Sequence, residues 1–170
     1  MREPDLADKI TSGESALIDS MGPDQVCEEL VRLGGAIDEE TRRDRPGPTD
    51  KDVDTDPSDV EQRMERLFRE IQALPGRDIA HARMVYLALS TSDYKHFAAT
   101  LMADLAEADL GYALPIWEGL MGDPDLSVRY PAYSALVHDA PKRDAIQMDF
   151  RSVIPLFEAY RIASTRNERR

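Results

Sequence analysis

The stretch Leu114–Val137, LPIWEGLMGDPDLSVRYPAYSALV, decides the fold expected for this chain. Its first half is apolar and helix-forming, and the GDPD sequence at 122–125 predicts a turn. Its second half predicts another helix, in which small residues recur at regular spacing. Two helices joined by so short a turn form a hairpin that cannot bury its apolar faces alone, so we expect it to stack on neighbouring hairpins.

Each helix of this hairpin carries one apolar face. The residues on these faces are Leu114, Trp117, Leu120 and Met121 in the first helix, and Val128, Ala132, Ala135 and Leu136 in the second. The two alanines allow a close approach between helices. Arg129 follows Asp123 by six positions, and we expect its side chain to reach back across the turn, where carboxylates can also accept hydrogen bonds from free backbone N–H groups.

This pattern resembles a HEAT-type helical repeat. Such repeats have a proline in the first helix, an aspartate at the turn and Val-Arg early in the second helix, followed by a small residue and an Ala-Leu pair. The matching residues are Pro115, Asp123, Val128, Arg129, Ala132, Ala135 and Leu136. The resemblance implies that Asp123 and Arg129 help to tie neighbouring hairpins together. Pro131 departs from the pattern, because a proline in the body of a helix is expected to kink it.

A partial second copy of the motif follows. LPIWE at 114–118 and IPLFE at 154–158 correspond term by term, 40 residues apart. The copy stops after its first helix, which is typical of a terminal cap. We therefore predict an all-α fold built as a short stack of antiparallel helical hairpins, a HEAT-like α-solenoid with an N-terminal helical pair. An irregular helical bundle is the alternative.

The chain divides by composition into three segments. Residues 1–37 predict an N-terminal helical segment, in which Gly22-Pro23-Asp24 begins a helix with an apolar stripe at Val26, Leu30, Leu33 and Ile37. Residues 38–56 are charged and proline-containing, which indicates a polar linker. Residues 57–165 form the HEAT-like helical domain. Its helices are expected over 57–74, 78–90, 94–108, 112–121, 125–138 and 144–163.

The overall charge restricts the partners. The formal net charge is -12, so a polyanion is repelled at long range and nucleic acid is disfavoured as a ligand. The one cysteine, Cys27, leaves no internal disulfide and no cysteine-based zinc site. No signal peptide and no membrane-spanning stretch is recognisable, so we expect a cytoplasmic protein without a membrane partner.

No residue pattern in the sequence predicts catalysis or a cofactor. His81, His96 and His138 lack the ligand spacing of metalloenzymes, although His81 and His96 could face each other from consecutive helices. Cys27 is followed by Glu28 and Glu29, whose charges disfavour a reactive thiolate. We therefore predict no catalytic residue, no metal ligand and no cofactor.

The sequence favours a non-enzymatic protein–protein interaction module: an adaptor, a regulatory subunit or an inhibitor that presents an acidic helical surface. Another protein, basic in view of the charge, is the expected partner. Trp117, Tyr130 and Tyr133 are the candidate interface anchors, because aromatic side chains are enriched at binding hot spots. For Trp117, a place in the core is the competing interpretation.

Two alternatives remain open at this stage. An enzyme or nucleic-acid-acting protein of the DNA-glycosylase type can use a HEAT-like fold, but it needs a basic groove with stacking aromatics. The only candidate patch is the C-terminal run Arg161, Arg166, Arg169 and Arg170. A helical homodimer is the other alternative.

Overall fold

The structure is a computed structural model that describes residues 18, 20–43 and 59–167. Within these residues it contains helices and no strand, so the all-α class is confirmed. The chain divides into two units, Met1–Ile71 and Gln72–Arg170. The division lies inside helix α4 (Asp59–Arg77) rather than in the expected linker. The expected helical structure of residues 1–17 and most of that linker lie outside the described residues.

The N-terminal unit contains α3 (Pro23–Arg43) and the larger part of α4. As expected, α3 begins at Pro23, and the Gln25 side chain accepts a hydrogen bond from the Gly22 N–H at 3.0 Å. The residues of the predicted apolar stripe are fully buried at Val26, Leu30 and Leu33 and half-buried at Ile37. From α4, the buried residues of this unit are Leu67 and Ile71.

Both helices run further than the sequence suggested. α3 continues through Gly34–Gly35 to Arg43, into the stretch expected to be linker. An ion pair between Glu39 and Arg43, one turn apart, stabilises this polar end without any apolar burial. α4 likewise passes Pro75 and ends at Arg77. A proline this close to the end of a helix removes one backbone hydrogen bond and leaves the preceding turns intact.

The C-terminal unit is a succession of shorter helices. They are α5 (Ile79–Thr91), α6 (Lys95–Thr100), α7 (Met102–Ala108), α8 (Leu110–Met121), α9 (Leu126–Ser134), the π-helix η1 (Ala135–Asp139), the 3-10 turn η2 (Ala140–Lys142) and α10 (Phe150–Asn167). Aspartates begin four of them: Asp78, Asp109, Asp125 and Asp149 each accept a hydrogen bond from a backbone N–H in the first turn of α5, α8, α9 and α10.

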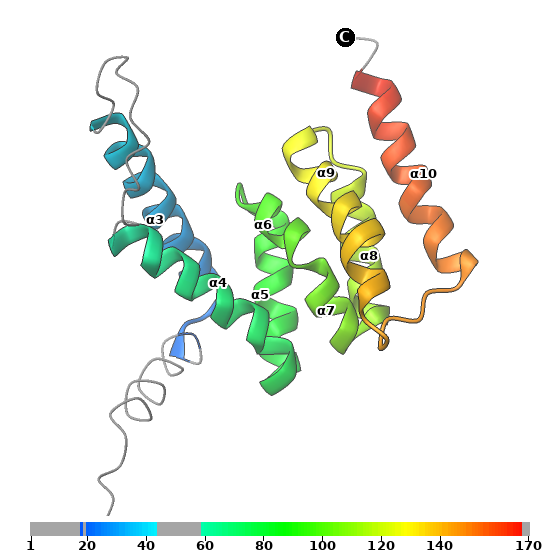
Figure 1. The fold of residues 1–170 in the computed structure, drawn as a ribbon, viewed down its shortest axis with the longest axis horizontal. Coiled ribbons are helices and arrows are strands. Elements are labelled where there is room, and N and C mark those ends of the chain that lie inside the picture. Colours follow the sequence, from blue (N-terminus) through cyan, green and yellow to red (C-terminus); the bar gives the residue numbers. More distant parts are fainter. Residues whose placement is uncertain (1–17, 19, 44–58, 168–170) are drawn as a thin grey trace, which may run out of the picture. The chain divides into compact units, whose positions relative to one another are not determined.

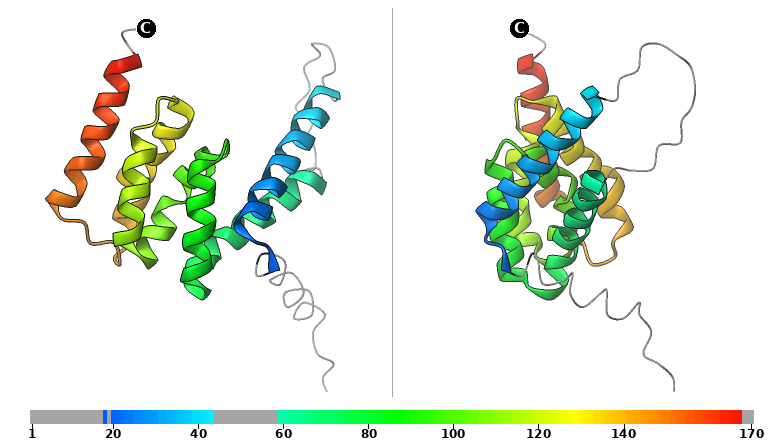
Figure 2. Two further views of the ribbon diagram at one scale, coloured as in Figure 1. Left: turned by 180° about the vertical axis from the view of Figure 1, so that it is seen from behind. Right: turned by 90° about the vertical axis from the view of Figure 1, so that its left-hand side faces the viewer.

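These helices form two layers. In one layer α8 lies between α5 and α10 and contacts both (Figure 2, left). In the other, α6 contacts α9 and α7 contacts η1 (Figure 1). The largest fully buried side chains are those of Trp117 and Tyr86, and many of the other buried positions are alanines. Small residues let neighbouring helices approach closely, so the core combines close helix packing with two large rings.

The second helix of the predicted hairpin is not uniform. α9 accommodates Pro131, and a π-helix follows over Ala135–Asp139, where the Ala140 N–H is bonded to the Ala135 carbonyl. The indole N–H of Trp117 donates to the carbonyl of Ala132 at 2.8 Å. The helix was expected to be irregular at Pro131. The irregularity instead appears one turn later, as the π-helix that follows the Ala132 carbonyl bonded by Trp117.

α10 begins at Phe150 instead of near 144. The carboxylate of Asp149 accepts hydrogen bonds from the N–H and hydroxyl of Ser152, at 2.8 and 2.7 Å, and so serves as the N-cap. The segment before α10 is held against α7 by Arg143, whose guanidinium pairs with Asp104 at 2.8 Å and Glu107 at 2.7 Å. None of the helices in the described part of the chain combines the length and the apolar character needed to cross a bilayer.

Candidate interaction surfaces

The turn between α8 and α9 is held by Asp123, which is 9% exposed. One of its carboxylate oxygens accepts from the Asp125 N–H at 2.8 Å, and the other pairs with the ammonium of Lys95 at 2.6 Å. Lys95 stands at the start of α6, in the preceding pair of helices. The aspartate thus connects two successive helix pairs and orders the turn between its own helices.

Arg129 lies beneath the same turn and is 4% exposed. Its guanidinium donates to the carbonyl of Asp123 at 3.2 Å and to that of Pro124 at 2.9 Å. It therefore satisfies two carbonyls of the turn between α8 and α9. Both charged side chains are buried and make these contacts within the unit, although the Nε of Arg129 is buried without a hydrogen-bond partner among the described residues.

The remaining motif residues take similar structural places. Val128, Ala132, Ala135 and Leu136 are buried, and Pro115 is exposed on α8. Trp117 is fully buried, so it does not serve as an exposed interface anchor; its ring fills the core. Tyr130 remains available at 58% exposure, and Tyr133 is half-buried.

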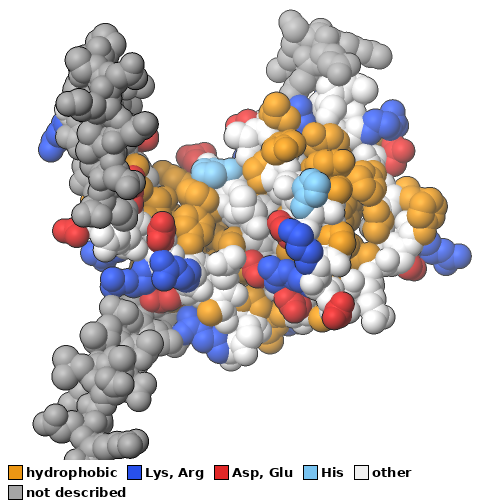
Figure 3. All heavy atoms as spheres, in the orientation of Figure 1, with side chains coloured by type: hydrophobic (Ala, Val, Ile, Leu, Met, Phe, Trp, Pro, Cys, Tyr) orange, Lys and Arg blue, Asp and Glu red, His pale blue; other side chains and the backbone are white. Residues whose placement is uncertain are grey.

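An apolar groove, here called the α10 groove, lies between η1–η2 and α10 and has a volume of about 390 Å³. Its lining contains no charged side chain and consists of Leu136, Val137, Ala140, Pro141, Ile146, Met148, Val153 and Phe157. The widened turn of η1 contributes Leu136 and Val137 to one wall. Figure 3 shows hydrophobic side chains gathered over α9 and towards α10 on this face.

Three large side chains of α10 project beside this groove. Phe150 is 80% exposed, Ile154 43% and Phe157 41%, and their spacing of four and three residues places them on one stripe of the helix. We call them the α10 stripe. Further along the helix, Tyr133 joins α9 to α10, because its ring lies 4.8 Å from the ring of Tyr160 and 6.1 Å from that of Phe157.

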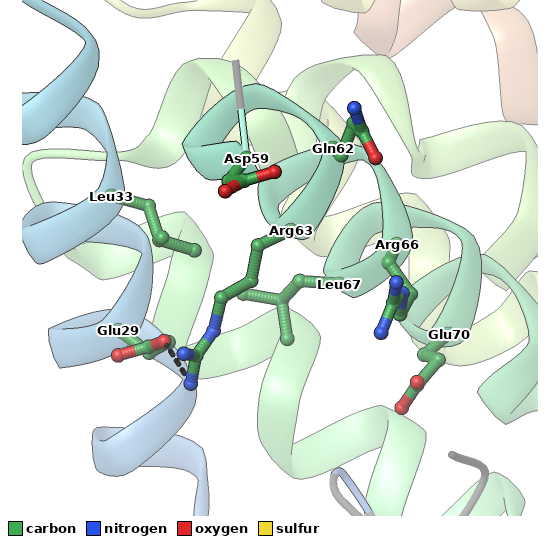
Figure 4. Close-up of a pocket in the computed structure, with 8 residues that line it drawn as sticks. All are labelled: Glu29, Leu33, Asp59, Gln62, Arg63, Arg66, Leu67 and Glu70. Carbon is green, nitrogen blue, oxygen red and sulfur yellow. Dashed lines mark ion pairs between the residues drawn. The ribbon is translucent and has the colours of Figure 1, made fainter. Parts of the chain in front are cut away.

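The N-terminal unit has a groove of a different kind, of about 360 Å³, between α3 and α4 (Figure 4). Two leucines and six polar or charged residues line this α3–α4 groove: Glu29, Leu33, Asp59, Gln62, Arg63, Arg66, Leu67 and Glu70. Glu29 and Arg63 meet across it in an ion pair at 2.9 Å. Glu29 also pairs with Arg32 at 2.8 Å, and these arginines hold the pKa of its carboxyl below the ordinary value.

Charge is distributed unevenly between the two units. Residues 1–71 carry 20 acidic and 10 basic side chains, a net charge of -10, whereas residues 72–170 carry 13 and 11, a net charge of -2. The acidity that the sequence shows as a whole is therefore a property of the N-terminal unit. The unit that holds the α10 groove is close to neutral.

The titratable side chains of residues 20–43 and 59–167 are the remaining candidates for a metal site. Among the described residues, no group of three or more His, Cys, Asp or Glu is placed to hold a metal ion. His96 has its ring 3.9 Å from that of Phe97, and burial lowers its pKa while Asp125 opposes the shift. The backbone of His81 is engaged with the Asp78 cap, and no interaction joins the two histidines.

Sequence reasoning missed both grooves as sites. The α10 groove depends on residues such as Ile146 and Met148 in the segment before α10, which was expected to be helical. A detectable signal existed in Phe150, Ile154 and Phe157, whose helical spacing continues the apolar pattern to residues that the core does not cover. Comparisons with protein-family models, with curated proteins and with solved structures found no match to this chain.

Proposed function

We propose that the protein is a non-enzymatic interaction module whose acidic N-terminal unit binds a basic segment of another protein. The observation that carries this proposal is the charge distribution: a net charge of -10 belongs to residues 1–71, out of -12 in the whole chain. A field of this sign attracts a basic partner and raises its rate of association.

The α3–α4 groove is the proposed binding site for the partner's basic segment. Leu33 and Leu67 offer apolar contact, and the carboxylates of Glu29, Asp59 and Glu70 stand around them. A helix with lysines or arginines beside an apolar stripe suits such a combination. Arg63 is already paired with Glu29, so its charge opposes a cationic ligand less than an unpaired arginine would.

The C-terminal unit is proposed to be a HEAT-like stack that supports this module. Two observations support this. The helices α5, α8 and α10 follow one another in one layer, and an ion pair between Lys95 and Asp123 joins consecutive helix pairs. Nucleic acid is the less favoured ligand, because the net charge of -12 repels its phosphates.

Capture of the partner from native extract, followed by binding measurements on the purified pair, tests the proposal. The immobilised full chain should retain a protein rich in lysine and arginine. Its affinity should fall as salt is raised from about 0.1 M to 1 M, because the screening length shrinks from roughly 10 to 3 Å. Recovery of nucleic acid, or an affinity that salt does not change, would contradict the proposal.

Matched triple variants locate the binding surface. Neutralising three exposed carboxylates of α3 (Asp24→Asn, Glu28→Gln, Asp38→Asn) should weaken binding at least about tenfold. The control removes the same charge from exposed positions of the C-terminal unit (Asp93→Asn, Glu118→Gln, Asp144→Asn) and should leave the affinity within about twofold. Equal losses in both variants would show that only the total charge matters.

A further inference from the structure

The outer side of α10 is incompletely covered. Among the described helices, α10 packs mainly on α8, while the α10 stripe stands exposed beside the α10 groove. Phe157 lines this hollow, and Phe150 and Ile154 lie on the same exposed stripe of the helix. A projection and a hollow side by side on one surface are what an isologous interface requires, because each copy then supplies both to the other.

The charged residues of α10 favour an antiparallel orientation of a second copy on this surface. Asp149 stands at the N-terminal end of the helix, and Arg161 and Arg166 lie in its second half. Two such helices packed antiparallel can bring Asp149 of each copy beside Arg161 of the other and Arg151 beside Glu158, and their helix dipoles also oppose favourably. Arg161 is paired with Glu158 at 2.7 Å, but its side chain is 65% exposed and can reach a second carboxylate.

We propose that two copies of this chain associate through α10, with the helices antiparallel about a two-fold axis near Pro155. In this register Phe157 of each copy stands level with Val153 of the other, at the α10 groove, and Arg161 stands level with Asp149. The interface lies on the unit whose net charge is -2, so repulsion between the two surfaces that meet is small. The inference does not depend on the basic partner proposed above.

Sedimentation velocity of the full chain over a range of concentrations tests the association. The wild-type protein should convert from monomer to dimer as its concentration rises. Phe150→Asp places a charge within the proposed buried surface and should raise the dissociation constant at least about tenfold. Since Phe150 is 80% exposed in the single chain, this variant should fold normally. Met84→Asp, on an exposed residue of α5, is the matched control and should dimerise like the wild type.

Single cysteines in a Cys27→Ala background test the register. With a rise of 1.5 Å per residue, the two copies of residue 154 are offset by only about 3 Å along the axis, whereas those of residue 166 are about 33 Å apart. Ile154→Cys should therefore cross-link under mild oxidation and Arg166→Cys should not. A monomer at all concentrations, a dimer that Phe150→Asp leaves intact, or cross-linking at both positions would each overturn the proposal.

Discussion

The two units bury their apolar residues in different ways. The N-terminal unit buries the apolar stripes of two long amphipathic helices, which contribute a net charge of -4 within residues 1–71, while residues 1–22 and 44–58 contribute the other -6. The C-terminal unit packs shorter helices in two layers around Trp117 and Tyr86, and its ion pairs, such as Lys95–Asp123, hold helices to one another. In the N-terminal unit most ion pairs of the described residues lie within one helix, as in Glu65–Arg69, whereas several ion pairs of the C-terminal unit join different helices.

The largest effect should come from the centre of the C-terminal unit. Trp117→Ala removes the largest fully buried side chain and should lower the free energy of unfolding by about 3–5 kcal/mol. Trp117→Phe keeps a ring but leaves the Ala132 carbonyl without its indole donor, and should cost about 1–3 kcal/mol. Urea unfolding followed by far-ultraviolet circular dichroism measures both. A loss below about 1 kcal/mol for the alanine variant would contradict the assigned core.

The second largest effect on stability should come from the ion pair between Lys95 and Asp123, which joins two helix pairs. Lys95→Met removes the ammonium from the nearly buried Asp123 and should cost about 1–2 kcal/mol. In a double-mutant cycle with Asp123→Asn, the coupling energy should reach about 0.5–2 kcal/mol. The exposed pair Arg69–Glu65 in the N-terminal unit provides the matched cycle, with an expected coupling of only about 0.3–0.5 kcal/mol. Equal couplings would remove the distinction drawn between the units.

A smaller and pH-dependent effect is expected at the start of α8. Hydrogen bonds from Arg83 and from the Tyr112 N–H hold the pKa of Asp109 below its ordinary value. The carboxylate therefore stabilises the fold above the pKa of the unfolded chain, about 3.9, and this contribution disappears as the pH falls through the lower folded value. Asp109→Asn keeps a cap acceptor but loses the ion pair with Arg83, and should cost about 0.5–1 kcal/mol near pH 7.

Unfolding of the wild type and Asp109→Asn at a series of pH values checks this sign. The difference between them should shrink as the pH is lowered from about 5 to 3. A difference that stays constant over this range would mean that the carboxylate charge contributes nothing at this cap.

The smallest effect on stability is expected for the exposed acids of the N-terminal unit. Glu28→Gln and Asp38→Asn should each change the free energy of unfolding by no more than about 0.5 kcal/mol, since both side chains are exposed. Thermal unfolding measures this directly. A loss above about 1 kcal/mol would indicate that these carboxylates stabilise the fold instead of serving a partner.

Local patterns predicted much of the C-terminal unit. Helix starts at Asp78 and Asp125 follow from capping chemistry, which acts within three residues. The sequence could not show that Trp117 would donate to Ala132, since that contact depends on how α8 and α9 pack. The apolar stripe of α10 was visible as helical spacing, but the neighbouring hollow arises from the π-helix and the segment before α10, neither of which has a local signature.

Amide hydrogen exchange on the full chain with its captured basic partner tests the division between the two units most directly. The account predicts that the partner slows exchange in α3 and in the part of α4 up to Ile71, while exchange in α8 and α9 stays as in the unbound chain. Slowed exchange confined to Gln72–Arg170, with α3 unchanged, would contradict it.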